Sequence, residues 1–223
     1  MKRLGIVGFL VAALVAALGI STASAKNVLV GRTPAGVLAP GAKVKAFSSN
    51  LIFETSAGNL ECEENELIGT QENNEAVKIK GKVTEEFSKG NFEKIPGACK
   101  TSATGPVTIL SSGFPWPTEQ TTKGTGKVKG TKKVTFDSTF LAIEGPNNHC
   151  TFEASKVAFS FNTGGIGKPE IVTETTTKQT FKHAKKAPNQ TALCPASGVL
   201  SGTFSIKAGP GFSELVESEL KSV

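Results

Sequence analysis

The side chains able to do chemistry in this sequence include two histidines, His149 and His183. Neither lies in a Gly-x-Ser-x-Gly or His-Glu-x-x-His motif, the local signatures of a serine nucleophile and of a zinc hydrolase. A Ser-His-acid triad can be assembled from residues far apart in sequence, so a secreted hydrolase with a dispersed site stays open. Exposed turn histidines are the favoured interpretation, and no catalytic residue is assigned.

Glutamates cluster at positions 61, 63, 64 and 66, with two more at 72 and 75. Paired carboxylates serve glycoside cleavage or bind calcium. On a strand, however, Glu61 and Glu63 would face one side while Glu64 and Glu66 face the other. Calcium loops favour aspartate, and Asp137 is the only one in the chain. A solvated turn is therefore predicted, without a metal or a cofactor.

Lysines concentrate in residues 78–82, 123–133 and 178–186, and the formal net charge is +6. The middle stretch contains a possible anion-binding surface for a cell-envelope polymer, formed by Lys123, Lys127, Lys129, Lys132 and Lys133. It lacks aromatic residues on which bases could stack, so no specific nucleic-acid partner is expected. Exposed lysines also prevent edge strands from pairing between molecules, and this is the favoured interpretation.

Trp116 is the only tryptophan and lies in the sequence Phe114-Pro115-Trp116-Pro117. Aromatic residues between prolines could form a rigid loop tip for recognition. They could also form a plug over one end of the core, which is favoured because indole rings are usually largely buried.

The four cysteines, Cys62, Cys99, Cys150 and Cys194, predict two disulfides in an oxidising compartment. A four-cysteine zinc site is disfavoured because no Cys-x2-Cys pair is present. Loop-closure entropy does not separate the three possible connectivities, since each bridge contributes roughly 4–5 kcal/mol in any of them.

The first 25 residues read as a secretory signal peptide. Lys2 and Arg3 precede an apolar run over residues 4–20, and Ala23-Ser24-Ala25 forms a small-x-small cleavage site. Cleavage after Ala25 predicts a secreted protein with no membrane attachment. An uncleaved anchor is the alternative, because the run approaches the roughly 20 residues of a membrane span.

Period-two alternation of apolar and polar residues dominates the remaining chain. It is clearest over residues 77–83, where valine, isoleucine and glycine alternate with lysine, and it recurs in 132–143, 157–161 and 200–206. Many short strands separated by Gly, Asn and Pro predict an all-β, antiparallel sandwich, with a β-barrel as the second architecture. The predicted organisation is an irregular segment over 26–44, a β domain over 45–207 and a tail over 208–223.

The β domain also repeats itself loosely, as two halves over about 45–120 and 131–207. Phe53, Gly58 and Cys62 in the first half are echoed by Phe140, Gly145 and Cys150 in the second. Each half then closes with another cysteine, a glycine and an apolar strand. This spacing predicts one bridge in each half, Cys62–Cys99 and Cys150–Cys194.

Several stretches resemble a family of uncharacterised exported β proteins from soil actinobacteria. They are residues 53–62, Phe-Glu-Thr-Ser-Ala-Gly-Asn-Leu-Glu-Cys, the Pro-Trp turn at 114–117, Asn-His-Cys-Thr-Phe at 148–152, and 194–204. The resemblance spans most of residues 45–207. It implies a bacterial source, export, β structure and paired cysteines, but no activity.

Three functions remain open from sequence. The favoured one is a non-enzymatic secreted or cell-surface binding or structural protein, expected to be a monomer. The others are the dispersed-site hydrolase and an inhibitor or toxin-like effector whose loops act from a disulfide scaffold.

Overall fold

The described part of the chain is built from β-strands, as the alternation predicts. The computed structural model describes residues 27–90, 97–102, 105–122, 125–128, 134–140, 148–161, 170–171, 173–188 and 190–223. The predicted signal peptide, residues 1–25, lies outside these ranges. One 3₁₀ turn, Pro210–Phe212, separates strands near the C-terminal end. The predicted all-β, antiparallel class is confirmed.

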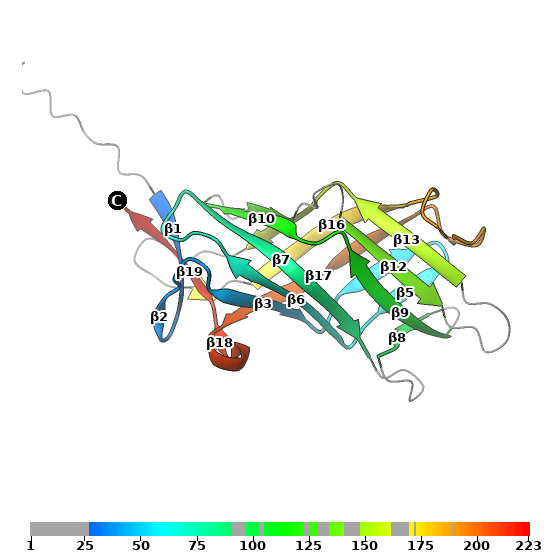
Figure 1. Cartoon of the computed structure of the whole chain (residues 1–223), viewed down its shortest axis with the longest axis horizontal. Helices are drawn as coiled ribbons and strands as arrows, with labels where there is room; N and C mark the ends of the chain where they lie inside the picture. The colour runs from blue at the N-terminus through cyan, green and yellow to red at the C-terminus, as the bar shows by residue number, and fades with distance from the viewer. Residues whose placement is uncertain are drawn as a thin grey trace, which may run out of the picture.

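Most strands belong to one large sheet, in which pairs of consecutive strands lie roughly end to end (Figure 1). Among the described residues there are six such pairs: β3 (Lys43–Ser48) with β4 (Ile52–Thr55), β5 (Gly58–Glu61) with β6 (Glu64–Gln71), β7 (Lys78–Lys89) with β8 (Cys99–Thr101), β9 (Gly105–Ser112) with β10 (Trp116–Thr121), β11 (Thr125–Val128) with β12 (Val134–Phe140), and β13 (Asn148–Ala154) with β14 (Val157–Phe161). Two long strands complete the circuit, β16 (Thr173–His183) and β17 (Ser197–Ala208). The short strand β18 (Glu214–Leu215) adds to the end of β17.

Hydrogen-bond registers show that the sheet closes on itself. The β3–β6 and β4–β5 ladders share one continuous register, from Lys43↔Thr70 to Thr55↔Gly58. β17 pairs with β16 on one side and with both β3 and β4 on the other. The large sheet therefore closes into a barrel, which is the second architecture that the sequence predicts, after the favoured sandwich.

A smaller sheet lies at one end of the long axis of the molecule (Figure 1). It contains β1 (Asn27–Thr33), β2 (Gly36–Val37), β15 (Glu170–Ile171) and β19 (Glu217–Ser222). The stretches predicted as an irregular segment and a tail thus contribute strands, with Asn27 opposite Ser222. The two partners are 195 residues apart (222 minus 27), so a local pattern could not reveal that they pair.

Leu29 anchors the small sheet on the large one. Its N–H donates to the Ala76 carbonyl at 2.8 Å, and its carbonyl accepts from the Ala76 N–H at 3.2 Å. The Leu29 side chain is fully buried against Ile79 and Phe159. These contacts hold the small sheet against β7 and β14.

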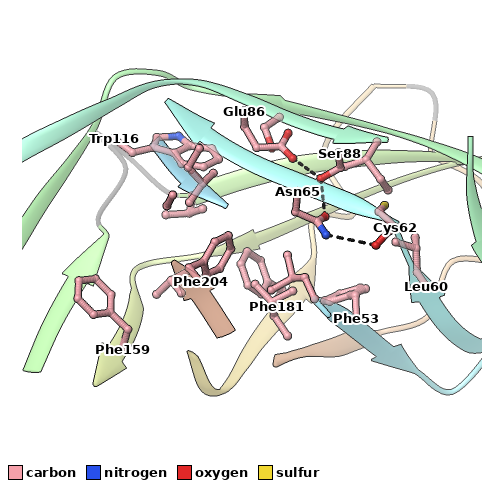
Figure 2. A pocket seen from close by; sticks show the side chains of 18 residues that line it. Phe53, Leu60, Cys62, Asn65, Glu86, Ser88, Trp116, Phe159, Phe181 and Phe204 are labelled. Carbon is pink, nitrogen blue, oxygen red and sulfur yellow. Dashed lines mark hydrogen bonds between the residues drawn. The ribbon is translucent and has the colours of Figure 1, made fainter. Parts of the chain in front are cut away.

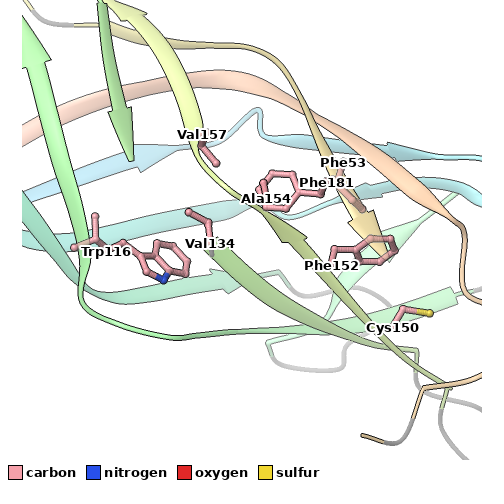
Figure 3. Packing of buried hydrophobic residues seen from close by; sticks show 9 residues of the cluster. Phe53, Trp116, Val134, Cys150, Phe152, Ala154, Val157 and Phe181 are labelled. Carbon is pink, nitrogen blue, oxygen red and sulfur yellow. The ribbon is translucent and has the colours of Figure 1, made fainter. Parts of the chain in front are cut away.

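The main core lies inside the closed sheet, where alternate residues point inward. The Phe53 ring meets the edges of Phe152 and Phe181, with ring centroids 4.9 and 6.0 Å apart (Figure 3). Val134 and Val157, both from runs with single-parity hydrophobic residues, are buried in the same cluster. The predicted core face of these runs is confirmed where their side chains are described.

Both predicted disulfides are present. Cys62 bonds Cys99 and Cys150 bonds Cys194, with Cα atoms 4.5 and 5.5 Å apart. The first bridge joins the segment between β5 and β6 to β8, and the second joins β13 to the loop before β17. Two structural disulfides suggest an extracellular or otherwise oxidising environment.

Candidate functional site

The interior of the closed sheet contains a cavity of about 120 Å³ (Figure 2). Its wall is mostly apolar, and its aromatic members are Phe53, Trp116, Phe159, Phe181 and Phe204. A second cavity of about 110 Å³ adjoins the first, because Ala46, Leu67 and Phe159 line both. A concave, largely apolar space with a few polar groups is the usual form of a small-molecule site.

A one-residue bulge in β7 places a carboxyl on this wall. Up to Val83 the strand alternates, with Ile79 and Val83 buried. The register with β6 then shifts, because Ile68 pairs with Glu85 whereas Gly69 pairs with Val83, which leaves Thr84 without a ladder partner. A one-residue slip moves every later side chain to the opposite face.

The inversion has opposite effects on two neighbouring side chains. Glu86 lines the cavity, whereas Phe87, which unbroken alternation would turn inward, is 48% exposed. Bulges are frequent beside functional sites, where they re-aim a side chain. Here the bulge exchanges a phenylalanine for a carboxyl in the interior.

Gly69 accommodates this irregularity from the neighbouring strand. A Cβ at Gly69 would lie 2.1 Å from the carbonyl oxygen of Lys82, far inside van der Waals contact. Only glycine lets the β6 backbone approach β7 this closely at the bulge. Gly69 therefore supports the placement of Glu86 without touching it.

Glu86 belongs to a row of hydrogen-bonded polar side chains along the cavity wall, of which Asn65 is buried and Glu86 and Ser88 are partly buried (Figure 2). The Ser88 hydroxyl lies within hydrogen-bond reach of Glu86 Oε1 and is 3.0 Å from Asn65 Oδ1. Asn65 Nδ2 donates to the carbonyls of Ser48 and Cys62, both at 3.4 Å. Because a serine hydroxyl carries one hydrogen, Ser88 can donate to only one of its two neighbours. Both hydrogen bonds of Ser88 form at once only when Glu86 is protonated: Glu86 then donates to Ser88, and Ser88 donates to Asn65.

The surroundings of Glu86 favour that protonated form. Burial raises the pKa of its carboxyl above the usual range, and this effect outweighs the opposing influence of the Ser88 and Ser111 hydroxyls. Among the described residues that line the cavity, Glu86 is the only acidic or basic side chain.

The second carboxyl oxygen, Glu86 Oε2, is enclosed, and no described donor meets hydrogen-bond geometry with it, although the Ser111 hydroxyl lies near enough to the carboxyl to lower its pKa. Two other buried polar atoms among the described residues lack a hydrogen-bond partner, Gln71 Nε2 and Glu214 Oε2. Gln71 lines the second cavity and Glu214 lines neither of the two. Glu86 thus combines an oxygen that lacks a described donor with a position on the wall of the first cavity.

Trp116, predicted as either a plug or a loop tip, is 4% exposed and lines the cavity. Its Nε1–H donates to the Ser112 carbonyl at 3.0 Å, and its ring stacks with Phe114 at 4.4 Å between centroids. The loop-tip alternative is therefore wrong for Trp116, because the start of β10 turns the indole inward. Phe114 is only partly buried.

The basic hairpin falls largely outside the described residues. Lys123, Lys129, Lys132 and Lys133 lie there, and only Lys127 is described. Lys127 Nζ is 3.1 Å from Glu119 Oε1, and Lys78 Nζ is 3.3 Å from the same oxygen. Binding of an anionic polymer by this surface stays a prediction.

The clustered glutamates pair with lysines across strands. Glu61 meets Lys100 at 2.9 Å, Glu64 meets Lys89 at 2.8 Å, and Glu66 meets Lys45 at 3.0 Å, between Oε and Nζ atoms. The Glu61 and Glu64 pairs are largely exposed and contribute little stability, whereas the Glu66–Lys45 pair is partly buried. No group of three or more His, Cys, Asp or Glu side chains positioned to hold a metal occurs among the described residues.

The favoured interpretation of exposed turn histidines is wrong, because His149 lies in β13 and His183 in β16, and both are partly buried. His183 takes part in a hydrogen-bond network. Its Nε2 lies 3.1 Å from Gln190 Oε1, which also accepts the Thr151 backbone N–H at 2.6 Å. Gln190 Nε2 in turn donates to Thr151 Oγ1 at 2.8 Å. His183 therefore takes part in fastening the loop before β17 to β13.

Comparisons with protein-family models, with curated proteins and with solved structures found no match. Within the described ranges, no helix has the length and apolar character needed to cross a membrane. The site must therefore be interpreted from its own geometry.

Sequence reasoning did not single out Glu86. Continued alternation from Ile79 and Val83 places Glu86 on the solvent face, and only the unpaired Thr84 reverses this. A glycine within a strand, such as Gly69, is a local sign of a bulge, but Gly81 inside β7 carries the same sign, so the sequence does not locate the bulge.

Proposed function

We propose that this chain is a non-enzymatic, exported bacterial binding protein that holds a small, largely apolar molecule inside its closed sheet. The observation that carries the proposal is the interior cavity with its single buried carboxyl. An engineered apolar cavity of roughly 150 Å³ in another protein binds benzene, so a space of about 120 Å³ suits a ligand of one ring.

The chemistry of the wall supports binding rather than catalysis. The nucleophile nearest to an acid or base in the cavity is the Ser88 hydroxyl, beside Glu86. A serine nucleophile needs a neighbouring base to take its proton. Since burial favours protonated Glu86, that carboxyl is poorly suited to the role.

Export is supported by two independent features. The first 25 residues carry the pattern of a cleaved leader, and the disulfides form a covalent framework suited to an oxidising compartment. The resemblance to exported actinobacterial proteins agrees with both.

Binding can be followed through the protein's own fluorescence. The chain has one tryptophan and no tyrosine, so its near-ultraviolet emission reports on Trp116 at the cavity wall. Titration of the oxidised protein with toluene, benzyl alcohol and benzylamine should give a saturable change in emission with at least one of them. Absence of a saturable change with all three would refute the proposal.

A cavity-filling substitution provides the specificity control. Ala46→Leu adds bulk where the two cavities meet and should abolish the change in emission. Ala192→Leu adds the same bulk in an exposed loop and should leave binding unchanged. Thermal unfolding shows whether Ala46→Leu is folded. If it is not, Leu200→Phe fills another part of the cavity wall and replaces it as the test variant.

A further inference from the structure

The polar group of the cavity also narrows the chemistry of its ligand. We infer that the site selects a small primary amine on an apolar, one-ring body, with the ammonium group bound by Glu86 Oε2. This inference rests on the proposed function and adds to it the class of ligand.

The first step concerns the Glu86 oxygen that lacks a described hydrogen-bond donor, Oε2, which a ligand would reach by a small turn of the carboxyl toward the cavity. Oε1 lies in the row with Ser88 and Asn65, whereas Oε2 is enclosed without a partner among the described atoms. A buried carboxyl oxygen that accepts no hydrogen bond costs free energy, and a ligand N–H that donates to it would remove that cost. The ligand must therefore carry a hydrogen-bond donor at this end.

The second step concerns charge. No lysine, arginine or histidine lies among the described residues of the cavity wall, so the protein supplies no cation to Glu86 there. An ammonium group within hydrogen-bond distance would favour the ionised carboxylate and form a charge-assisted bond, the stronger type. A hydroxyl donor would gain only the weaker bond between less polar groups, and an anionic ligand would find no cation on the described wall to offset its charge.

The third step concerns the rest of the ligand. Five aromatic side chains line the wall, including Trp116, Phe159 and Phe181. Their rings provide apolar contact for a ring-sized body, and their faces attract a nearby cation. An aromatic amine such as benzylamine therefore matches both the apolar wall and its polar corner.

The experiment compares benzylamine, benzyl alcohol, toluene and benzoate at one neutral pH, on the wild-type protein and two variants. Wild type should bind benzylamine at least about tenfold more tightly than benzyl alcohol, as expected for a hydrogen bond between charged groups. Glu86→Gln should remove most of that preference while toluene affinity changes less than about threefold. Glu85→Gln, the exposed neighbour on the same strand, should behave as wild type.

The outcomes separate the two claims. If toluene or benzyl alcohol binds as tightly as benzylamine, if benzoate binds more tightly, or if Glu86→Gln keeps the amine preference, the ligand class is wrong while cavity binding stands. If no probe binds to the wild-type protein, the proposed function itself fails.

Discussion

At the scale of single residues, Glu86 is an ionisable group held where water is scarce. Its enclosure raises the pKa of the carboxyl and favours the protonated form, although the Ser88 and Ser111 hydroxyls act in the opposite direction. A carboxyl kept in such a place reduces stability, and that makes its titration measurable. Proteins often retain unfavourable groups of this kind where they bind a ligand.

The pH dependence of stability should reveal this group. Because its pKa is raised on folding, the unfolded state loses the Glu86 proton at a lower pH than the folded state does. At pH values below the pKa that Glu86 has in the unfolded state, the carboxyl is protonated in both states and does not make the free energy of unfolding depend on pH. As the pH rises from there through the folded pKa, the wild-type protein loses stability that Glu86→Gln does not lose.

Urea unfolding between about pH 4 and pH 8 measures this effect, since the window begins near the ordinary glutamate pKa and extends well above it. The advantage of Glu86→Gln in free energy of unfolding should grow with pH and then level off. The free energy of unfolding of Glu85→Gln should change with pH in the same way as that of the wild type. A constant difference between wild type and Glu86→Gln across the range would contradict the raised pKa.

At the scale of elements, the bulge at Thr84 decides which side chains of β7 enter the interior. The structure therefore predicts unequal effects for two phenylalanines. Phe87→Ala should change the free energy of unfolding by less than about 1 kcal/mol, because the ring is 48% exposed. Phe181→Ala removes a side chain that is 1% exposed and should cost about 3–5 kcal/mol.

Denaturant unfolding of both variants checks this. Equal losses would mean that the ring of Phe87 is buried and that β7 continues its alternation without the bulge. The comparison is matched, since both substitutions remove the same atoms from a strand.

The strands themselves were largely predictable, and the site was not. Alternation over residues 77–83 and single-parity hydrophobic residues such as Val157 and Phe159 located strands and their core faces. These signals are local, and a strand needs only a local pattern. The position of Glu86 depends instead on how β7 aligns with β6, and the pairing of β1 with β19 depends on a partner 195 residues away (222 minus 27). Both features depend on pairing between separate segments, so no single stretch of sequence predicts them.

At the scale of the whole molecule, two covalent bridges reinforce the closed sheet. They span similar separations, 37 and 44 residues, so chain entropy assigns each about 4 kcal/mol. Replacing Cys62 and Cys99 by alanine, or Cys150 and Cys194, should therefore destabilise the protein to a similar extent. Denaturant unfolding of the two double variants tests this, and a pair with no measurable loss would show that its bridge does not constrain the unfolded chain.

The closure of the sheet also sets an order in time. A chain made from its N-terminal end presents Phe47 of β3 long before Ser205 of β17, its partner across the closing ladder, has been synthesised. Until then β3 and β4 keep one unsatisfied backbone edge, and β1 waits still longer for β19. Open edges of this kind pair readily with other chains. A chain halted before β17 is thus expected to associate with its own copies, and only synthesis of the last strands gives it a finished surface.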